Sequence, residues 1–295
     1  MKLRIFIVIV AVMVAWVAGR SIKSGGQSIV RSVQHDTHDA HEGDAPPAPP
    51  APNAPDAPDA PASGGSERRI DESYELADGA SVEVHGINGP VTVEAIDGNT
   101  AEVHITSTAS SMSDLNDARI TVEHTEKSLV VRGKGNYGGS FWKWLRGGSS
   151  EVRHNVLLKL PRHVELATSG TNGNVRIGEM EGAVEVSGIN GRVELGGAHG
   201  FAEISGVNGG VVVTVIELND KGLQVNGING GVEIRVGRDV NADVELEGVN
   251  GYMKVEAPNV EVKEQKRNRL RARIGTGGAN IEAHGINGGV RLVGV

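Results

Sequence analysis

The chain contains no cysteine and very few aromatic residues. Without cysteine, disulfide bonds, thiolate metal ligands and a lipid-modified N-terminal cysteine are all excluded. Phe, Trp and Tyr make up only 3% of the 295 residues, which predicts a thin core of Val, Ile and Leu. The net charge of −8 lacks the basic excess that nucleic-acid binding requires, so we expect no nucleic-acid partner.

Established catalytic motifs are also missing from the sequence. There is no Gly-x-Ser-x-Gly elbow, no His-Glu-x-x-His zinc motif and no phosphate-binding P-loop. We therefore predict a protein that is not an enzyme, with no catalytic residues and no cofactor. A polysaccharide-active enzyme stays open as the rival class, because acidic side chains gathered in a groove could serve as an acid and base pair.

Glycine is abundant, at 42 residues, and much of it lies in a repeated tetrad, Gly-x-Asn-Gly. The tetrad occurs seven times, and consecutive copies in the middle of the chain start 18 or 21 residues apart. A fixed period indicates one structural unit stacked repeatedly. Asn and Gly accept left-handed backbone conformations at low cost, so the tetrads are predicted turns between short strands. The turn asparagines are Asn88, Asn172, Asn190, Asn208, Asn229, Asn250 and Asn287.

Two all-β folds fit this pattern. In a single-stranded parallel β-solenoid, one coil spans one tetrad period and holds two strands, and the turn asparagines stack into a hydrogen-bonded ladder. In an antiparallel β-meander or sandwich, each Asn-Gly pair lies at the tip of a hairpin. The recurrence of one turn type once per coil favours the solenoid, because a meander gains nothing from repeating every second turn.

The N-terminus has the features of a targeting element. Lys2 and Arg4 precede an apolar run at residues 5–18, as in a signal peptide, and the run is short for a membrane span. Residues 1–19 are therefore predicted to be a signal peptide or a short membrane anchor. Either alternative exports the rest of the chain to the periplasm or cell envelope, and the second keeps it in the inner membrane.

Two further regions follow the targeting element. Residues 20–66 hold a His/Asp-rich stretch and then a Pro/Ala-rich stretch, with eight of the eleven prolines between Pro46 and Pro61. Such a composition cannot bury a core, so this region is predicted to be a disordered linker. Residues 67–295 are predicted to form the β-solenoid domain, with an aromatic, glycine-rich insert at 133–150.

The region from about Ser73 to Val295 resembles the bacterial DUF4097 family, described as candidate adhesins with β-strand repeats. The resemblance lies in Gly-Ile-Asn-Gly-Pro-Val-Thr-Val at 86–93, Leu-Lys-Leu-Pro at 158–161 and the run at 168–177. It implies an exported or envelope-associated β-helix-like protein. It supplies no catalytic residues to carry over.

The insert at 133–150 is the most individual segment of the chain. It carries both Trp residues outside the targeting element, and Trp or Tyr beside Lys and Arg is typical of membrane interfaces and of protein interfaces. The alternative is a lid that folds over an open end of the repeats. The residues predicted to contact a membrane surface or a partner are Tyr137, Phe141, Trp142, Trp144 and Leu145.

Histidine and glutamate give weaker candidates. His35, His38 and His41 are spaced three apart among carboxylates and could capture Zn²⁺ or Ni²⁺ loosely, so we predict no dedicated metal site. A column of outward residues, three places before each tetrad, is interpreted as a solvated face rather than a Ca²⁺ surface. Its members are Glu83, Ala167, Glu185, Glu203, Gln224, Glu245 and Glu282.

Two other polar groups are interpreted structurally. The residues directly before the tetrads, His85 and His284 among them, are read as turn residues without a catalytic role. The basic run Lys263–Arg273 is predicted to be a solvated strand with Leu270, Ala272 and Ile274 inward. Contact with anionic lipid or polysaccharide is its minority alternative.

These observations favour an exported cell-envelope scaffold of β-repeats, adhesin-like or otherwise an interaction module, that does not act as an enzyme. Its expected partner is an envelope protein, a membrane surface or a polysaccharide. The alternatives are a polysaccharide-binding or polysaccharide-active protein and a self-assembling envelope protein. Self-association through the ends stays open because the repeats continue to Val295 without a polar cap in the sequence.

Overall fold

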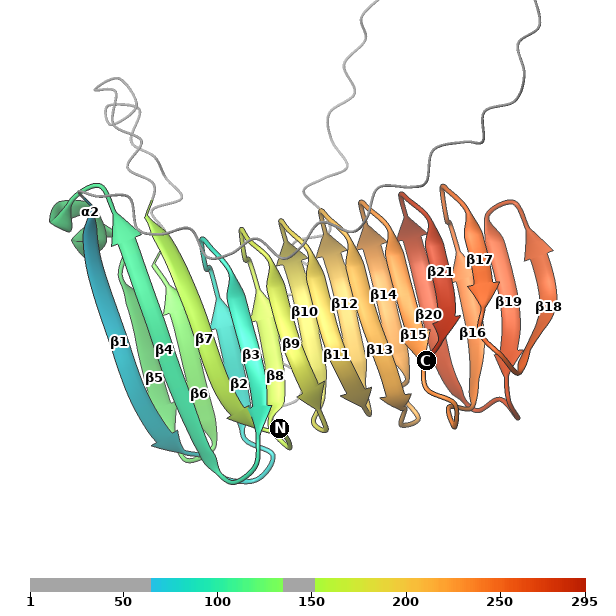
Figure 1. Ribbon diagram of the computed structural model, residues 1–295, viewed down its shortest axis with the longest axis horizontal. Coiled ribbons are helices and arrows are strands. Elements are labelled where there is room, and N and C mark those ends of the chain that lie inside the picture. The colour runs from blue at the N-terminus through green and yellow to red at the C-terminus, as the bar shows by residue number, and fades with distance from the viewer. Residues whose placement is uncertain (1–64, 135–151) are drawn as a thin grey trace, which may run out of the picture. The chain divides into compact units, whose positions relative to one another are not determined.

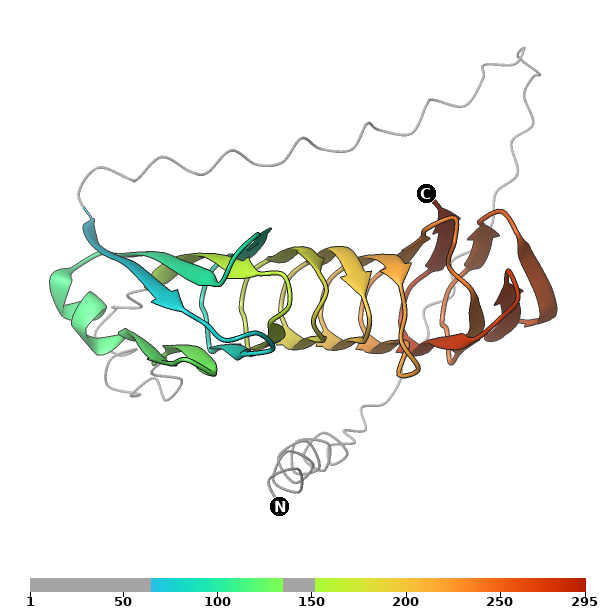
Figure 2. The same cartoon turned by 90° about the horizontal axis from the view of Figure 1, so that it is seen from below.

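The computed structural model describes residues 65–134 and 152–295, which form an all-β unit (Figure 1). The predicted all-β class is confirmed, because 21 strands and one short helix, α2 (Met112–Asp117), make up the regular structure of the described residues. The strands lie in two large mixed sheets, which Figure 2 shows as two facing layers. Neither sheet closes on itself, so each has two edge strands.

The two sheets are named A and B, and their strands are given in spatial order. Sheet A consists of β1 (Ser66–Glu75), β4 (Thr100–Ala109), β7 (Arg153–Pro161), β3 (Val91–Ile96), β9 (Val175–Met180), β11 (Val193–His199), β13 (Val211–Glu217), β15 (Val232–Val236), β21 (Val290–Gly294) and β17 (Met253–Glu256). Sheet B consists of β18 (Val260–Lys266), β19 (Arg269–Ile274), β16 (Ala242–Glu247), β20 (Ala279–Ile286), β14 (Leu223–Ile228), β12 (Ala202–Val207), β10 (Val184–Ile189), β8 (Glu165–Ser169), β2 (Ser81–His85), β6 (Ser128–Gly133) and β5 (Ile120–Thr125).

From β8 to β15 the chain alternates between the sheets. A strand of sheet B, the tetrad that follows it and the next strand of sheet A together make one lap. Each central strand pairs in parallel with the strand one lap later, so that Val186 lies opposite Ile204, and Ile204 lies opposite Val225. These steps along the chain equal the steps between the matching tetrads. The spacing of the tetrads along the chain therefore sets the register in which neighbouring strands pair.

Antiparallel pairing is confined to the two ends of the unit. In sheet A, β4 pairs antiparallel with both β1 and β7; in sheet B, β5 pairs antiparallel with β6, and β19 with both β16 and β18. The two-sheet sandwich arrangement fits the structure. The antiparallel order that came with that alternative is wrong for the central laps.

The core is a narrow layer of aliphatic side chains between the sheets. Val186, Ile204 and Val225 follow one another along a column of sheet B and are at most 1% exposed. Each such side chain contributes about 1.5–3 kcal/mol to folding by leaving water. Thr168 and Thr171 are buried polar residues that interrupt this apolar layer. Their hydroxyl oxygens have no hydrogen-bond partner among the described residues.

At the C-terminal end, the order of strands in space departs from their order in the chain. The lap of β20 and β21 lies between the lap of β14 and β15 and the lap of β16 and β17. The hairpin of β18 and β19 then extends sheet B beyond β16. The last repeat is thus an inner lap, which corrects the expectation that the repeats simply run out at Val295. Leu270, Ala272 and Ile274 point inward from β19, as predicted. The basic run Lys263–Arg273 is not the single strand that was expected, because a turn divides it between β18 and β19.

The N-terminal end also contains elements that the sequence did not predict. These are β1, which is rich in charged residues, and the single-turn helix α2, with Ser111 as its N-cap. The lap of β2 and β3 lies between β8 and β9 on one side and β6 and β7 on the other. Across the described ranges, no helix has the length and apolar character needed to cross a membrane.

Candidate interaction surfaces

The seven turn asparagines lie in one continuous column, formed by the turns in which the chain passes from sheet B to sheet A. The Nδ2 atom of Asn190 donates to Oδ1 of Asn172 at 2.8 Å, and Oδ1 of Asn190 accepts from Asn208 at 3.0 Å. The same bond joins every neighbouring pair, at 2.8–3.2 Å. The spatial order of the column is Asn88, Asn172, Asn190, Asn208, Asn229, Asn287 and Asn250.

Glycine is required at both ends of each tetrad, for two different reasons. The first glycine adopts a left-handed conformation, with φ of +63° at Gly188 and +61° at Gly206. The last glycine allows the turns to stack closely, since a Cβ atom added to Gly191 would lie 2.3 Å from the carbonyl oxygen of Gly173. The turns therefore form a tight rim of backbone and asparagine side chains.

The outer face of sheet B carries the glutamate column. Glu185 lies directly opposite Glu203 on the neighbouring parallel strand, and Ala167 and Gln224 flank the pair. The pKa of Glu185 is raised, mainly because its carboxyl group is partly desolvated and to a smaller extent because Glu203 and Glu165 repel its charge. Further along, Glu245 has its pKa lowered because Arg271 and Arg269 donate hydrogen bonds to it.

A second column on sheet B brings a serine, a histidine and a glutamate together. The Nδ1 atom of His85 lies 2.6 Å from Oγ of Ser169, and its Nε2 atom lies 2.9 Å from Oε2 of Glu83. A hydroxyl, an imidazole and a carboxylate in this order are also the parts of a hydrolytic triad. From the sequence, His85 was expected to be a turn residue without a catalytic role.

The surroundings of these three side chains do not suit hydrolysis. A triad requires free backbone N–H groups that can stabilise an oxyanion. The N–H group of Gly86 donates to the carbonyl oxygen of Ser169, and that of Gly170 donates to Ser187. The neighbouring amides are therefore engaged in the sheet, and the three side chains act as cross-strand contacts between β2 and β8.

The outer face of sheet A also carries ion pairs between neighbouring strands. Nε of Arg176 lies 3.4 Å from Oε2 of Glu194, its direct neighbour on the adjacent parallel strand. Nζ of Lys159 lies 2.8 Å from Oε2 of Glu102, and hydrogen bonds from Lys159 and then His104 lower the pKa of Glu102. Exposed ion pairs of this kind contribute little to stability.

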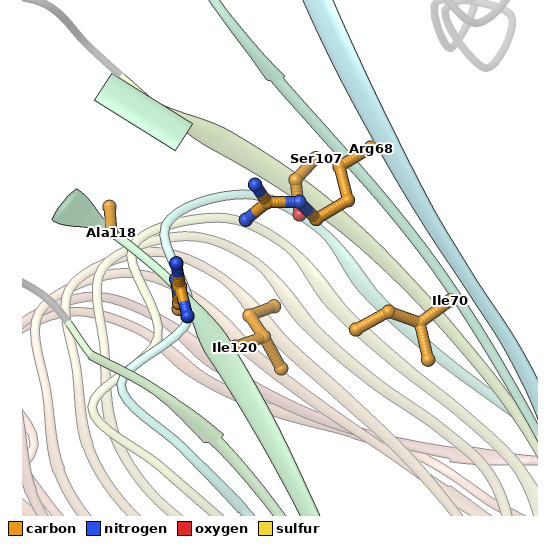
Figure 3. A pocket seen from close by; sticks show the side chains of 6 residues that line it. Arg68, Ile70, Ser107, Ala118 and Ile120 are labelled. Atoms are coloured by element: carbon orange, nitrogen blue, oxygen red, sulfur yellow. The ribbon is translucent and has the colours of Figure 1, made fainter. Parts of the chain in front are cut away.

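A pocket of about 340 Å³ lies at the N-terminal end, where β1 of sheet A faces β5 of sheet B. In Figure 3 the guanidinium group of Arg68 reaches over the pocket beside Ser107, and the side chains of Ile70 and Ile120 point toward each other. The lining residues are Arg68, Ile70, Ser107, Ala118, Arg119 and Ile120. No sequence motif indicated this pocket. The less exposed positions Arg68, Ile70 and Tyr74 share one face of β1, and this alternation is the signal by which the strand could have been found.

Several predicted site residues lie outside the described residues. They are the insert residues Tyr137, Phe141, Trp142, Trp144 and Leu145, together with His35, His38 and His41 of the linker. The targeting element and nearly all of the linker, residues 1–64, lie outside as well. Within residues 65–134 and 152–295, no group of three or more His, Cys, Asp or Glu side chains is arranged to hold a metal ion.

Several solved structures are similar to this chain at 10–15% sequence identity. A "putative cell adhesion protein" from Clostridium sporogenes is 14% identical, with a TM-score of 0.37, and the match covers 77% of this chain and all of that one. A "putative adhesin" from Bacteroides fragilis is 10% identical, with a TM-score of 0.30, over 77% of this chain and 98% of the other. A "putative lipid binding protein" from Parabacteroides distasonis is 15% identical, with a TM-score of 0.24, over 78% and 97%.

The remaining comparisons gave no match. No family model matches the chain, so membership of the DUF4097 family stays a prediction. No curated protein matches it either. Identities of 10–15% and TM-scores of 0.24–0.37 are too low for the solved structures to decide the fold or the role of this chain.

Proposed function

We propose that the protein is an exported cell-envelope scaffold that presents interaction surfaces and does not act as an enzyme. The observation that carries this proposal is the continuous stacking of laps, held by seven hydrogen-bonded asparagines and a shared aliphatic core. Such stacking gives an extended support in which each lap contacts its neighbours. The polysaccharide-active alternative needs an acid and base pair of carboxyl groups in a groove, and the pocket found in the described residues has no Asp or Glu in its lining.

The proposed scaffold is a single-stranded parallel β-solenoid in its central laps. Parallel register that advances by one tetrad period at each lap supports this proposal. Duplicating residues 188–205 adds one whole lap, so every strand keeps its sheet and its inward face. We expect this variant to keep a cooperative thermal transition.

The matched control duplicates only residues 188–196, which is half a lap. This insertion sends each later strand to the opposite sheet, and we expect it to unfold the protein. Equal tolerance of both insertions, measured by circular dichroism and thermal melting, would contradict the solenoid.

The proposed contact with the partner is made by the insert at 133–150, with Trp142 and Trp144 as its anchors. The described residues nearest to it support an accessible position: Lys134 donates its backbone N–H to Arg119 beside the pocket, and Val152 packs with Leu115 of α2. The insert therefore leaves and rejoins the N-terminal end of the unit. The partner is expected to be an envelope protein, a membrane surface or a polysaccharide.

Crosslinking the full chain in its native envelope tests this role. Three forms are compared: the wild type, the double variant Trp142→Ala/Trp144→Ala, and Tyr252→Ala. Tyr252 is a suitable control because it is 63% exposed and lies beside β17, at the opposite end of the unit. Crosslinked products lost only in the double variant would support the proposal, whereas identical products in all three would refute the role of the insert.

A further inference from the structure

The pocket at the N-terminal end brings two cationic side chains to one opening that also has aliphatic side chains in its lining. Arg68 lies on the face of β1 that also carries Ile70 and Tyr74, and so projects between the sheets rather than away from them. Arg119 comes from the other side, where it precedes β5. In the described part of the chain, no carboxylate forms an ion pair with either arginine.

Arg68 has a structural task that leaves most of its donors free. Its Nη1 atom donates to the carbonyl oxygen of Leu115 at 3.0 Å, and its Nη2 atom donates to Oδ1 of Asn116 at 2.7 Å. These bonds hold the guanidinium group against the last turn of α2, where helix carbonyls lack partners. A guanidinium group has five N–H bonds, so donors remain for a ligand.

The rest of the pocket is mainly uncharged. Ile70, Ile120 and Ala118 provide aliphatic walls. Oγ of Ser107 lies 2.9 Å from Nδ1 of His154, and burial lowers the pKa of His154, so this pair is neutral at pH 7. The hydroxyl of Ser107 has both a donor and acceptor capacity, which allows a second hydrogen bond.

These features select one class of ligand. Two arginines line this one pocket, and the planar donors of a guanidinium group match the two oxygens of a carboxylate. A volume of about 340 Å³ is at the lower limit for pockets that bind small molecules. The walls suit a short alkyl chain, and the size excludes a diacyl lipid or a folded partner.

We infer that this pocket binds a small aliphatic carboxylate, with Arg68 and Arg119 holding the acid group and Ile70 and Ile120 contacting the chain. The proposal uses none of the aromatic residues assigned to the insert and does not depend on the scaffold role, so either proposal can fail without the other. Arg68 holds α2 as well as the ligand. Arg119 is exposed and forms no side-chain hydrogen bond or ion pair with any described residue, so its substitution tests binding without disturbing the fold.

Equilibrium dialysis of the full chain with labelled hexanoate tests the site. The protein is kept in a non-ionic detergent, whose own uptake of hexanoate is the same for every variant. We expect saturable binding that Arg119→Gln weakens about tenfold, as for the loss of hydrogen bonds to a charged group. Hexanol, which has the same chain without the charge, should bind about tenfold more weakly than hexanoate for the same reason.

Matched variants separate a real site from a general effect. Arg192→Gln removes another exposed arginine far from the pocket and should leave hexanoate binding unchanged. Ala118→Leu fills the pocket and should abolish binding while the thermal midpoint stays near that of the wild type. Undiminished binding by Arg119→Gln, equal affinity for hexanol and hexanoate, or no saturable binding by the wild type would each overturn the inference.

Discussion

The central laps, β8 to β15, and the two ends of the unit are built by different routes. In the centre, strands that neighbour each other in space are one lap apart in the chain. At the C-terminal end, β14 pairs with β20, and Leu223 lies opposite Ile281 although β15 to β19 come between them in the chain. At the N-terminal end, Val84 of β2 lies opposite Thr168 of β8, although β3 to β7 come between them.

This difference has an energetic consequence. Closing a loop costs conformational entropy that rises slowly with loop length, and the cost precedes the gain from the contacts. The central laps can add one at a time, whereas each end forms only when a distant segment returns to complete it. We therefore expect the two ends to be less stable than the central laps.

The largest effect is expected from removing the returning lap. A chain that ends at Gly278 lacks β20 and β21, so β17 loses the only strand with which it pairs in the described structure. The sheet B strands β16, β18 and β19 would then be detached from the central laps. We expect trypsin to cut rapidly at Arg267, Arg269, Arg271 and Arg273.

Sites in the central laps serve as the internal control for this truncation. Arg176, within β9, and Arg192, directly before β11, should stay resistant, because both strands keep their two neighbours in sheet A. The same tryptic pattern from the truncated and full-length chains would show that the end does not depend on the returning lap.

A smaller effect, at a single site, is expected where the turns of neighbouring laps are in close contact. Gly191→Ala would place a Cβ atom 2.3 Å from the carbonyl oxygen of Gly173, so the backbone must shift. Forcing extra atoms into a packed site costs about 2 kcal/mol. Gly210→Ala is the matched control, since its nearest neighbour would be an oxygen at 3.7 Å. Chemical denaturation of both variants checks the difference, and equal losses would contradict close stacking of the turns.

The asparagine column allows the centre and an end to be compared directly. Asn190→Ala removes two hydrogen bonds, one to Asn172 and one from Asn208, whereas Asn250→Ala removes only the bond to Asn287. At about 0.5–1 kcal/mol for each bond, the inner substitution should cost about twice as much as the outer one. Denaturation midpoints measure both, and a larger loss from Asn250→Ala would mean that the column is not what holds the centre.

The sequence was sufficient to predict the repeating part of this structure. Alternation of Val82 with Val84 indicates a strand where the structure has β2, and that of Val91 with Val93 indicates one where it has β3. The tetrad spacing also predicts which asparagines share a column. Periodicity succeeds here because one residue pattern sets the turn, the inward face and the register together.

The ends were not predictable from the same pattern. All seven tetrads are alike, so nothing in them indicates that the seventh lies between the fifth and the sixth. The strand β1 was missed because charged residues outnumber apolar ones in it, and α2 because six residues are too few for a helical period. The pocket joins Arg68 to Arg119, and no local motif connects residues so far apart in the chain.

The smallest expected effect is a pH dependence located at the N-terminal end. Burial holds the pKa of His154 below its usual value of 6.5, so the folded state favours the neutral imidazole bonded to Ser107. Below pH 6.5 the unfolded chain binds a proton that the folded state still resists, and stability must fall as the pH falls toward the folded-state pKa. His154→Gln lacks this proton and should lose less stability between pH 7 and pH 5. Thermal midpoints across that range compare it with the wild type, and parallel curves would show that His154 is not the group responsible.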